Sequence, residues 1–437
     1  MELTELCKIF SNFGCKKVYV KSLSPNDNSK NQVYLAGSYD ILNILPIDEI
    51  YSDSNGDWKR DRFKASLNFF WISEEGKLNK APNAQLILYP KYPEVRFSGF
   101  LSRCENAPSE LMSTRLEGRL FFMSVTADGK VIGFVTSPSS KIAEDFKNLS
   151  DLESYGVFKV FKLFEQLNER EILLKELKRI YLLDWIKSKR LNTSGDIIDC
   201  EAPNCGGYTL EAELGIIPNG FSEPDFLGWE LKQFGVKNFE RTNNSIITLM
   251  TPEPNGGFYK DLGVEYFLRH YGYEDLMGRE DRINFGGIHK IGQLHPRTNL
   301  RMELIGFDFN SQKITNTNGR ISLIDDNDNE TASWTFSSLI KHWNRKHNQA
   351  CFIPSLTSSD PYRQYKFGNN ILLGTGTDFT FVLKQLGEGN IYYDPGIKME
   401  NISTNPRIKR RSQFRIKSGS LKTLYKKSEL IDLINSD

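Results

Sequence analysis

Histidine and cysteine, the usual ligands of structural zinc, are scarce in this sequence. The 437 residues include five histidines and six cysteines, and no CxxC motif occurs. The one close cysteine pair, Cys200 and Cys205, has no histidine near it. Because a zinc site needs four such ligands at characteristic spacings, the sequence argues against one. We expect the cysteines to be free thiols in a reducing compartment.

Long apolar segments and a nucleotide-binding loop are also missing. No hydrophobic run approaches the ~18 residues of a membrane-spanning helix, and residues 1–10 carry acids rather than the charge pattern of a signal peptide. We therefore expect a cytoplasmic protein with no membrane partner. The absence of a GxxxxGK[ST] sequence argues against dependence on a nucleotide.

Excess charge of one sign is missing from the chain as a whole but not from its C-terminal part. The net charge is +1, yet residues 401–430 contain nine Lys or Arg residues and a single acid, Glu429. A local basic segment on a nearly neutral protein suits a polyanion that contacts one face. On charge alone, a solvated charged tail explains the segment equally well.

The chain changes character about a third of the way along. Residues 16–140 alternate short runs rich in Val, Tyr, Phe and Ile with turn sequences such as PNDNS and ADGK, which predicts a mainly-β first domain. Leucines at three- and four-residue spacing then predict an amphipathic helix over 165–187. Mixed helical and strand patterns follow. We predict a first domain at 1–160, a helical linker at 161–184 and a second domain at 185–437.

In the second domain, the segment EPDFLGWELKQF at 223–234 places two acids, Asp225 and Glu230, and one lysine, Lys232, in an otherwise largely apolar run. Glu230 and Lys232 are two residues apart and so point to the same side of a strand, with Asp225 at the front of the segment. Paired carboxylates suit a hard cation such as Mg²⁺, and a neighbouring lysine can polarise a water molecule or hold a phosphate oxygen. An ion pair on an exposed strand remains the alternative, because D-x4-E-x-K alone is a weak signal.

The second domain resembles the MvaI/BcnI family of restriction endonucleases, within the PD-(D/E)XK nuclease superfamily. The segments that carry the resemblance, in chain order, are GYTLEAELGI, EPDFLGWELK, SIITLMTPEPNGG, FLRHYGYED, LRMELIGFDFNSQKI, GRISLID, WTFSSLIKHW and SQFRIKSGSLKTLY. The resemblance implies an α/β PD-(D/E)XK core, a mixed sheet flanked by helices. It follows the mainly-β domain, which would be a pseudobarrel that binds DNA.

The same resemblance implies roles for individual residues. Asp225 and Glu230 would bind Mg²⁺, Glu211 would help to bind or position the ion, and Lys232 would orient or activate the attacking water. Arg415 matches an arginine of the family's recognition segment, where arginine can contact guanine O6 and N7 together. Arg410, Arg411 and Gln413 are neighbouring candidates for DNA contacts. The family's recognition histidines are absent, since this stretch reads KRRSQFR.

The first domain is similar, over a short stretch, to the N-terminal effector DNA-binding domain of the EcoRII type, which has a B3-like fold. The similarity lies in KKVYVKSLSPNDNSKNQVYLAG, and EVRFSGFLSRCENAP falls where a second DNA-contacting arm is expected. By this analogy the candidate DNA contacts are Lys21, Ser22, Asn26, Asp27, Gln32, Arg96 and Arg103. A polar Asx-turn between two strands explains Pro25, Asn26 and Asp27 equally well.

Together the two resemblances imply a Mg²⁺-dependent, sequence-specific endonuclease for double-stranded DNA, a type II restriction enzyme of the IIE kind. The implied target is a CCNGG-like site, specifically CCWGG, with the first domain binding a second copy. We expect a monomer. Two alternatives stay open: a repair nicking endonuclease of the MutH kind and a non-catalytic DNA-binding regulator.

Three other polar residues are weaker signals. We interpret His289 and His295 as ordinary loop histidines that could also contact phosphate, and Asp394 as a turn residue.

Overall fold

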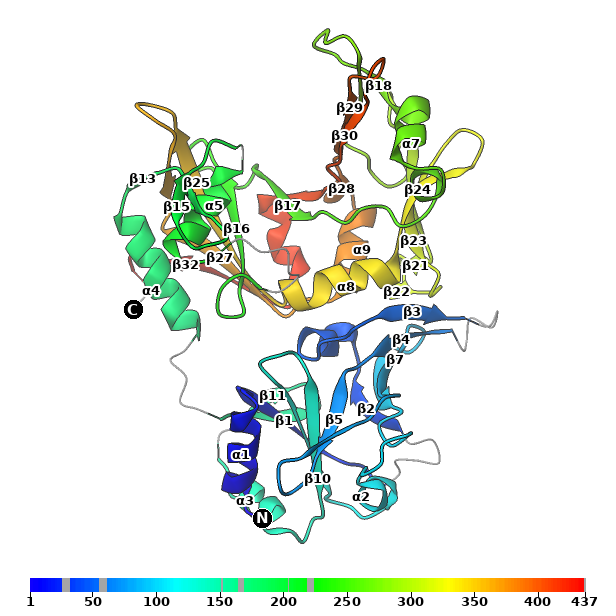
Figure 1. The fold of residues 1–437 in the computed structure, drawn as a ribbon, viewed down its shortest axis with the longest axis vertical. Coiled ribbons are helices and arrows are strands. Elements are labelled where there is room, and N and C mark those ends of the chain that lie inside the picture. The colour runs from blue at the N-terminus through cyan, green and yellow to red at the C-terminus, as the bar shows by residue number, and fades with distance from the viewer. Residues whose placement is uncertain are drawn as a thin grey trace. The chain divides into compact units, whose positions relative to one another are not determined.

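The protein is described here from a computed structural model covering residues 1–25, 32–54, 61–150, 152–163, 169–202, 204–217 and 224–435. The chain divides into two compact units, Met1–Gln166 and Leu167–Asp437 (Figure 1). Each unit has its own sheets and its own buried apolar residues. The described residues include no helix with the length and apolar character that crossing a bilayer requires.

Unit 1 is built mainly of strands in two sheets. The seven-stranded sheet has the order β11 (Glu153–Tyr155), β12 (Phe158–Lys162), β1 (Lys17–Ser22), β9 (Leu120–Val125), β10 (Val131–Thr136), β5 (Phe69–Ile72) and β6 (Leu78–Lys80). The five-stranded sheet has the order β2 (Gln32–Ala36), β8 (Glu94–Ser98), β7 (Gln85–Tyr89), β4 (Arg62–Ser66) and β3 (Ile50–Asp53). The helical elements are α1 (Leu3–Asn12), η1 (Tyr39–Asn43), α2 (Ser109–Ser113) and α3 (Lys141–Lys147).

Strand β9 shows why unit 1 holds together, because both of its faces are buried. Phe121 packs in an aromatic cluster with Trp71 of the same sheet and Phe97 of the other sheet. The neighbouring Phe122 lies in a second apolar cluster with Leu6 of α1 and Ile142 of α3. A strand covered on both faces reads as a continuous apolar run rather than an alternating one, which explains the sequence LFFMSV.

Unit 2 is a mixed α/β structure around a six-stranded sheet. The path of this sheet is β13 (Trp185–Lys187), β26 (Gln364–Phe367), β25 (Gln349–Ser358), β27 (Asn370–Thr375) and β32 (Lys427–Asp432), and β16 (Glu230–Gly235) pairs with β25 in parallel. The helical elements of the unit are α4 (Glu169–Leu182), α5 (Cys205–Glu213), α6 (Phe258–Asp261), α7 (Val264–Tyr271), α8 (Phe336–His347), α9 (Phe379–Gly387) and η2 (Ser418–Leu424). The amphipathic helix expected over 165–187 thus runs from Glu169 to Leu182 in α4, and the chain then enters strand β13.

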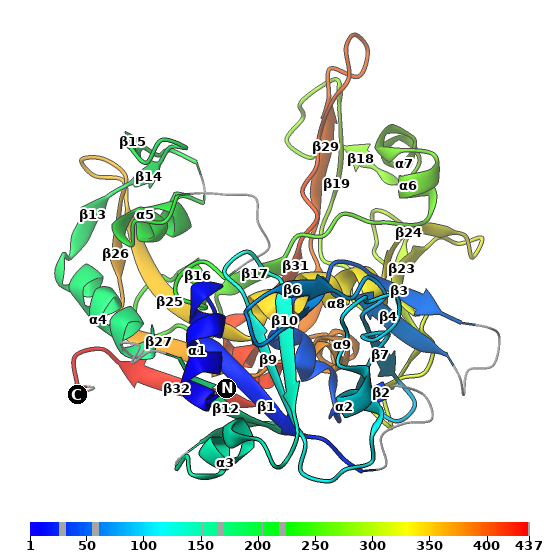
Figure 2. The ribbon, with the colours of Figure 1, turned by 60° about the horizontal axis from the view of Figure 1, so that its bottom comes forward.

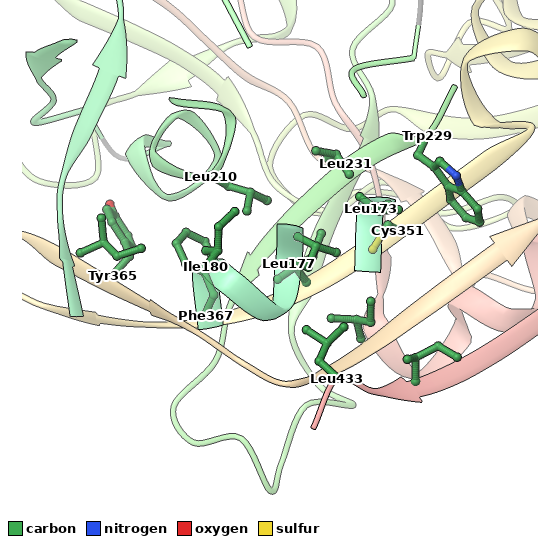
Figure 3. Packing of buried hydrophobic residues seen from close by; sticks show 14 of the residues in the cluster. Leu173, Leu177, Ile180, Leu210, Trp229, Leu231, Cys351, Tyr365, Phe367 and Leu433 are labelled. Atoms are coloured by element: carbon green, nitrogen blue, oxygen red, sulfur yellow. The ribbon is translucent and has the colours of Figure 1, made fainter. Parts of the chain in front are cut away.

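Helices α4 and α5 cover one face of the six-stranded sheet. Leu177 of α4 and Leu210 of α5 belong to one apolar cluster with Leu231 of β16 and Cys351 of β25 (Figure 3). In the parallel pair, Leu231 is in register with Cys351, so both side chains point to the same face. The residues on either side of Leu231, Glu230 and Lys232, therefore point to the opposite face.

The rest of unit 2 consists of smaller sheets. They are β17 (Ile246–Met250), β31 (Phe414–Lys417) and β28 (Ile391–Tyr393); β18 (Tyr273–Glu274), β19 (Arg282–Gly286), β29 (Gly396–Glu400) and β30 (Arg407–Lys409); β20 (Arg301–Ile305), β23 (Arg320–Ile324) and β24 (Glu330–Thr335); and the pairs β14 (Lys189–Leu191) with β15 (Ile197–Asp199) and β21 (Phe307–Asp308) with β22 (Lys313–Ile314). Strands β19 and β29 run side by side and project from the unit as an arm (Figure 2).

Candidate active site

A tight turn carries Asp225 back against the start of β16. The backbone groups of Phe226 and Trp229 bond to each other, with N···O distances of 3.0 and 2.8 Å. Between them Leu227 and Gly228 both have positive φ, at 48° and 81°, which is the backbone of a two-residue hairpin turn. Asp225 therefore lies before the strand, not on it, and its Oδ2 accepts a hydrogen bond from the backbone N of Leu231 at 3.0 Å.

The strand alternation brings Glu230 and Lys232 together on the face away from α4 and α5. Lys232 Nζ lies 2.5 Å from Glu230 Oε1, and the Glu230 side chain is only 1% exposed, whereas that of Lys232 is 21% exposed. The ion pair is therefore not the exposed surface pair that the sequence left open as an alternative. Burying a carboxylate costs several kcal/mol (roughly) without compensation, so this location needs a partner charge or a ligand.

Helix α5 presents Glu211 to the same acidic group. The helix packs closely on β16 because Gly206 has no side chain: a Cβ there would lie 2.6 Å from Gln233 Oε1. The other end of α5 is held by Glu213, whose carboxylate pairs with Lys189 at 2.5 Å and with Arg179 of α4 at 3.3 Å. Glu211 is thus fixed on a helix that is anchored at both ends.

The start of α5 is also held by a disulfide, which corrects one expectation from the sequence. Cys200 and Cys205 are joined in a disulfide across the loop that leads into α5, so the prediction that all six cysteines are free thiols is wrong. Within the described part of the chain, Cys7, Cys15, Cys104 and Cys351 are free. The spacing of five residues in the sequence was the only available signal for this pairing.

The pKa shifts of Glu211 and Glu230 show that the charged residues of the site interact with one another. Burial, followed by the charges of Asp225 and Glu230, raises the pKa of Glu211 to about 7. Burial also raises the pKa of Glu230, and the charge of Asp225 adds to that effect, while Lys232 and Lys346 oppose it. Carboxylates that raise one another's pKa are close neighbours, so the three acids and two lysines form one interacting group.

Sequence reasoning missed two residues at the end of α8: Lys346, which belongs to this group, and His347, which lies beside it. Lys346 Nζ lies 3.5 Å from Glu230 Oε2, with its own side chain 27% exposed. The His347 ring is buried, and burial, together with the positive charges of Lys232 and Lys346, keeps its pKa well below the ordinary value. Neither residue lies near 223–234 in the sequence, so only the fold places them at the site.

The donor set of the site suits a hard divalent cation. Glu230 Oε2 is buried and accepts no hydrogen bond from any described residue. Among the described residues, no three His, Cys, Asp or Glu side chains gather closely enough to enclose a cation by themselves. Mg²⁺ keeps several of its waters, however, and usually takes one or two protein carboxylates. Asp225 and Glu230 satisfy that requirement, so the residues present fit the ion that the sequence implied.

A second cluster surrounds Arg415 in the basic C-terminal segment. Arg415 lies on β31, in register with Thr248 of β17 and Tyr392 of β28. Its Nη1 donates to Asp394 Oδ2 at 2.6 Å, while its Nε is buried and has no hydrogen-bond partner among the described residues. Asp394, interpreted from the sequence as a turn residue, is therefore also the ion-pair partner of Arg415.

The neighbours of Arg415 differ in exposure. Gln413 has a buried Oε1 without a hydrogen-bond partner in the described structure, and its backbone O accepts from Asp394 N at 2.8 Å. Arg410 and Arg411 are exposed. Ser412, which follows them, is buried and donates its hydroxyl to Pro252 O at 2.5 Å. The segment is therefore held at one buried residue, with two arginines displayed to solvent beside it.

Several of the candidate DNA contacts in unit 1 lie on paired strands. Gln32 begins β2, and Arg96 lies on the adjacent β8, with Arg96 Nη1 3.5 Å from Gln32 Oε1. Lys21 and Ser22 end β1, and Lys21 Nζ lies 6.0 Å from the ring centre of Tyr34 on β2. Arg103 is exposed in a turn with φ of 57°. Asn26 and Asp27 lie outside the described residues.

The two histidines of the loop 287–298 support the structure of that loop. The rings of His289 and His295 stack with centres 4.2 Å apart, and Thr298 Oγ1 lies 3.1 Å from a ring nitrogen of each. Burial lowers the pKa of both rings, and that of His289 falls to about 3. Both rings are buried and hydrogen-bonded, which favours the interpretation as ordinary loop histidines over phosphate contacts.

The sequence profile of the MvaI/BcnI restriction endonuclease family matches residues 174–425, more than half of the chain. The chain belongs to the MvaI/BcnI restriction endonuclease family. It is accordingly a type II site-specific deoxyribonuclease, and double-stranded DNA is its partner. The matched range contains every residue of the acid and lysine cluster as well as Arg415, so the family assignment covers both candidate sites of unit 2.

Solved structures that are similar to parts of the chain include restriction endonucleases. The complex of restriction endonuclease MvaI with its cognate DNA substrate has a TM-score of 0.46 and 18% identity, over 61% of this chain and 99% of that chain. MvaI in the absence of DNA has a TM-score of 0.34 and 17% identity over the same shares. The UbaLAI restriction endonuclease B3 domain with cognate DNA has a TM-score of 0.21 and 18% identity, over 36% of this chain and 96% of that domain. No curated protein matches the sequence.

Proposed function

We propose that this enzyme hydrolyses both strands of double-stranded DNA at a CCNGG-like site, CCWGG in particular, with Mg²⁺ as its cofactor. The observation that carries the proposal is the buried Glu230 carboxylate, with Lys232 on one oxygen and the other oxygen without a hydrogen-bond donor in the described structure. The charge of Asp225 raises the pKa of Glu230, and the charge of Glu230 raises the pKa of Glu211, so the three carboxylates are close together. This is the donor set of metal-assisted phosphodiester hydrolysis.

The residues of the site have separate tasks in this proposal. Asp225 and Glu230 hold the ion, Glu211 supports it, and Mg²⁺ when bound supplies Lewis-acid stabilisation of the charge that develops on the phosphoryl group. Lys232 donates a hydrogen bond to the attacking water and orients its oxygen toward phosphorus. The water oxygen bonds to phosphorus and loses a proton to solvent, the bond between phosphorus and the 3′ oxygen breaks, and the 3′ oxygen takes up a proton from solvent. The products carry a 5′ phosphate and a 3′ hydroxyl.

Base recognition falls to the C-terminal segment in this proposal. Arg415 would read guanine through O6 and N7, and Gln413, Arg410 and Arg411 would contact bases or phosphates beside it. The ion pair with Asp394 supports this role, because it fixes the plane of the guanidinium before DNA arrives and so reduces the ordering cost of binding. CCWGG as the target rests on the family resemblance.

Cleavage of plasmid DNA tests the central proposal. Purified full-length protein with Mg²⁺ is expected to give discrete fragments whose ends, once sequenced, fall at one CCNGG-like site and carry 5′ phosphates. A chelator in excess over Mg²⁺ is expected to stop the reaction, because the ion is part of the site. Fragments with ends scattered over unrelated sequences would contradict the assignment, and nicks confined to one strand would favour the repair nicking enzyme instead.

For unit 1 we propose a B3-like domain that binds a second copy of the site, as in type IIE enzymes. Lys21, Ser22, Gln32, Arg96 and Arg103 are its proposed contacts, together with Asn26 and Asp27. The adjacency of Gln32 and Arg96 on paired strands supports a common DNA-facing group. Positive and amide side chains of this kind bind phosphates and base edges.

The effector role of unit 1 is tested on plasmids with one or two sites. The full chain is expected to cut the two-site plasmid faster, and Arg96→Ala is expected to reduce that advantage because a DNA contact of the second copy is lost. Removal of residues 1–165 is expected to abolish the advantage while cleavage continues. Lys77→Ala, at an exposed lysine between β5 and β6 of the same unit, serves as the matched control. A truncated protein that behaves like the full chain on both plasmids would refute the effector role.

A further inference from the structure

Two lysines, not one, bracket the carboxylate of Glu230. Lys232 Nζ lies 2.5 Å from Oε1 and Lys346 Nζ lies 3.5 Å from Oε2. The first distance is that of a hydrogen bond, whereas the second is too long for one. Oε2 therefore has a nearby positive charge but accepts no hydrogen bond from a described residue. Oε1 of Glu230 is hydrogen-bonded to a lysine, whereas Oε2 is not. Lys346 is therefore held more weakly than Lys232.

The end of α8 fixes the point from which Lys346 reaches the site. Trp343, one turn before it, is buried and donates from Nε1 to Thr377 Oγ1 at 2.9 Å, and Thr377 Oγ1 in turn donates to Leu424 O at 2.7 Å. The ring of His347, the residue after Lys346, stacks on Trp343 with centres 4.1 Å apart. The backbone at Lys346 is thus held by buried neighbours, while its long side chain is 27% exposed and flexible at the tip.

The charges of the group explain why a second lysine is placed there. Glu211, Asp225 and Glu230 contribute three formal negative charges, and the two lysines contribute two positive ones. A buried carboxylate without a compensating charge is strongly destabilised, so the second lysine stabilises Glu230 before any metal is present. If the site held a divalent cation, Glu230 would already have a positive partner, and the Lys346 ammonium would be repelled by that second cation.

A displaced Lys346 would have a DNA phosphate within reach if the proposed function holds. Under the proposed function, the scissile phosphate must sit beside the ion held by Glu230 and beside Lys232. Lys346 Nζ is already 3.5 Å from that same carboxylate, and four rotatable bonds let the ammonium swing to a neighbouring oxygen. Ammonium groups bind phosphate as point charges.

We propose that Lys346 exchanges partners during the reaction: it neutralises Glu230 in the metal-free enzyme, and it contacts a DNA phosphate once a divalent cation occupies Glu230. Lys346 thereby competes with the metal in the absence of DNA and holds the backbone beside the scissile bond in its presence. This inference rests on the proposed function of the Asp225, Glu230 and Lys232 group. A purely structural ion pair between Lys346 and Glu230 would stabilise the fold but would not move between partners.

Metal binding to the DNA-free enzyme tests the first half of the exchange. Titration of full-length Lys346→Gln with Mn²⁺, followed by electron paramagnetic resonance of the free ion, is expected to show affinity about two- to fivefold higher than for the wild type. This range corresponds to loss of a partly exposed ion pair that opposes the metal. Lys346→Arg keeps the charge and is expected to bind Mn²⁺ like the wild type. Equal or lower affinity of Lys346→Gln would overturn the proposal.

The salt dependence of DNA binding tests the second half. In Ca²⁺, under conditions where the DNA is recovered intact, the slope of log K against log salt is expected to be less steep for Lys346→Gln by about 0.9, the value of one phosphate contact. Without metal the two slopes are expected to coincide, because Lys346 then stays on Glu230. A difference that is absent in Ca²⁺, or equally present without metal, would overturn the proposal.

Controls separate this inference from the proposed function itself. Lys178→Gln, at an exposed lysine on α4, is expected to match the wild type in both measurements. Lys232→Gln is expected to lose cleavage, and a fully active Lys232→Gln would contradict the proposed function whatever Lys346 does. An inactive Lys232→Gln beside a Lys346→Gln that matches the wild type would contradict the exchange alone. If Lys346→Gln does not fold, Lys346→Met provides the neutral side chain with the same expected slopes.

Discussion

Replacing Asp225 or Lys232 with alanine is expected to reduce DNA cleavage by at least about 10²- to 10⁴-fold, the usual contribution of a positioned proton-transfer or water-orienting group. Asp225→Ala removes a proposed ligand of Mg²⁺, and Lys232→Ala removes the ammonium that we propose orients the water. Neither change removes Arg415 or the basic segment, so DNA is still expected to shift in a gel. Initial rates on a single-site oligonucleotide duplex, measured at saturating Mg²⁺, provide the test.

The controls for these variants follow from the burial of the site. Lys232→Ala leaves the buried Glu230 with Lys346 as its remaining lysine neighbour among the described residues, and this change is expected to lower the melting temperature. Lys178→Ala, an exposed lysine of α4, is expected to change neither property. If Lys232 were only structural, the folded fraction of Lys232→Ala would cleave at the normal rate. Unimpaired cleavage by both Asp225→Ala and Lys232→Ala would refute the site.

The proposed catalytic triplet of Asp225, Glu230 and Lys232 was accessible to sequence reasoning because its geometry is largely local. Glu230 and Lys232 share a face simply because side chains alternate along a strand, and that alternation depends on nothing outside the segment. The position of Asp225 was harder to predict, since it depends on the turn at Leu227 and Gly228. A leucine at positive φ gives no turn signal in the sequence, so the segment reads as one continuous strand.

The contacts of Lys346 and Asp394 could not be predicted from local sequence patterns. Lys346 reaches Glu230 only because α8 ends beside β16, and a lysine near the end of an amphipathic helix is ordinarily a solvated residue. Asp394 sits in YYDPG, where a turn explains it fully, and its pairing with Arg415 depends on β28 and β31 lying side by side. Contacts between distant segments come from the tertiary fold, which periodicity and spacing do not encode.

The secondary structure was likewise predictable where it depends on local sequence and not where it depends on distant contacts. Strands of unit 1 were predictable from apolar patterns, and α4 was predictable from its leucine spacing. The strand β13 that follows α4 was not, because a helical pattern extends through Trp185 although the chain turns at Asp184, which has φ of 58°. The disulfide between Cys200 and Cys205 was also beyond reach, since the composition of the chain favours free thiols and only the loop geometry brings the two sulfurs together.

Arg415→Ala is expected to lower the cleavage rate at the cognate site by about 5- to 150-fold, which corresponds to the roughly 1–3 kcal/mol of a bidentate contact with guanine. Lys does not replace this contact, because its ammonium cannot make two parallel hydrogen bonds, so Arg415→Lys is expected to be nearly as impaired. The loss is expected to be specific: on duplexes that already carry a substitution at the guanine in question, wild type and variant should cleave at similar rates.

Asp394→Ala separates base reading from mere structural support. Arg415 Nη1 is 2.6 Å from Asp394 Oδ2, and both side chains are about one-fifth exposed. If the ion pair only stabilises β28 against β31, Asp394→Ala and Arg415→Ala should lower the melting temperature and the activity to the same extent on every duplex. If Arg415 reads guanine and Asp394 orients it, Asp394→Ala keeps the preference for the cognate base pair at a reduced rate, whereas Arg415→Ala loses that preference. Cleavage rates on duplexes substituted one base pair at a time distinguish the two results, because a residue that contacts one base pair changes discrimination at that position and at no other.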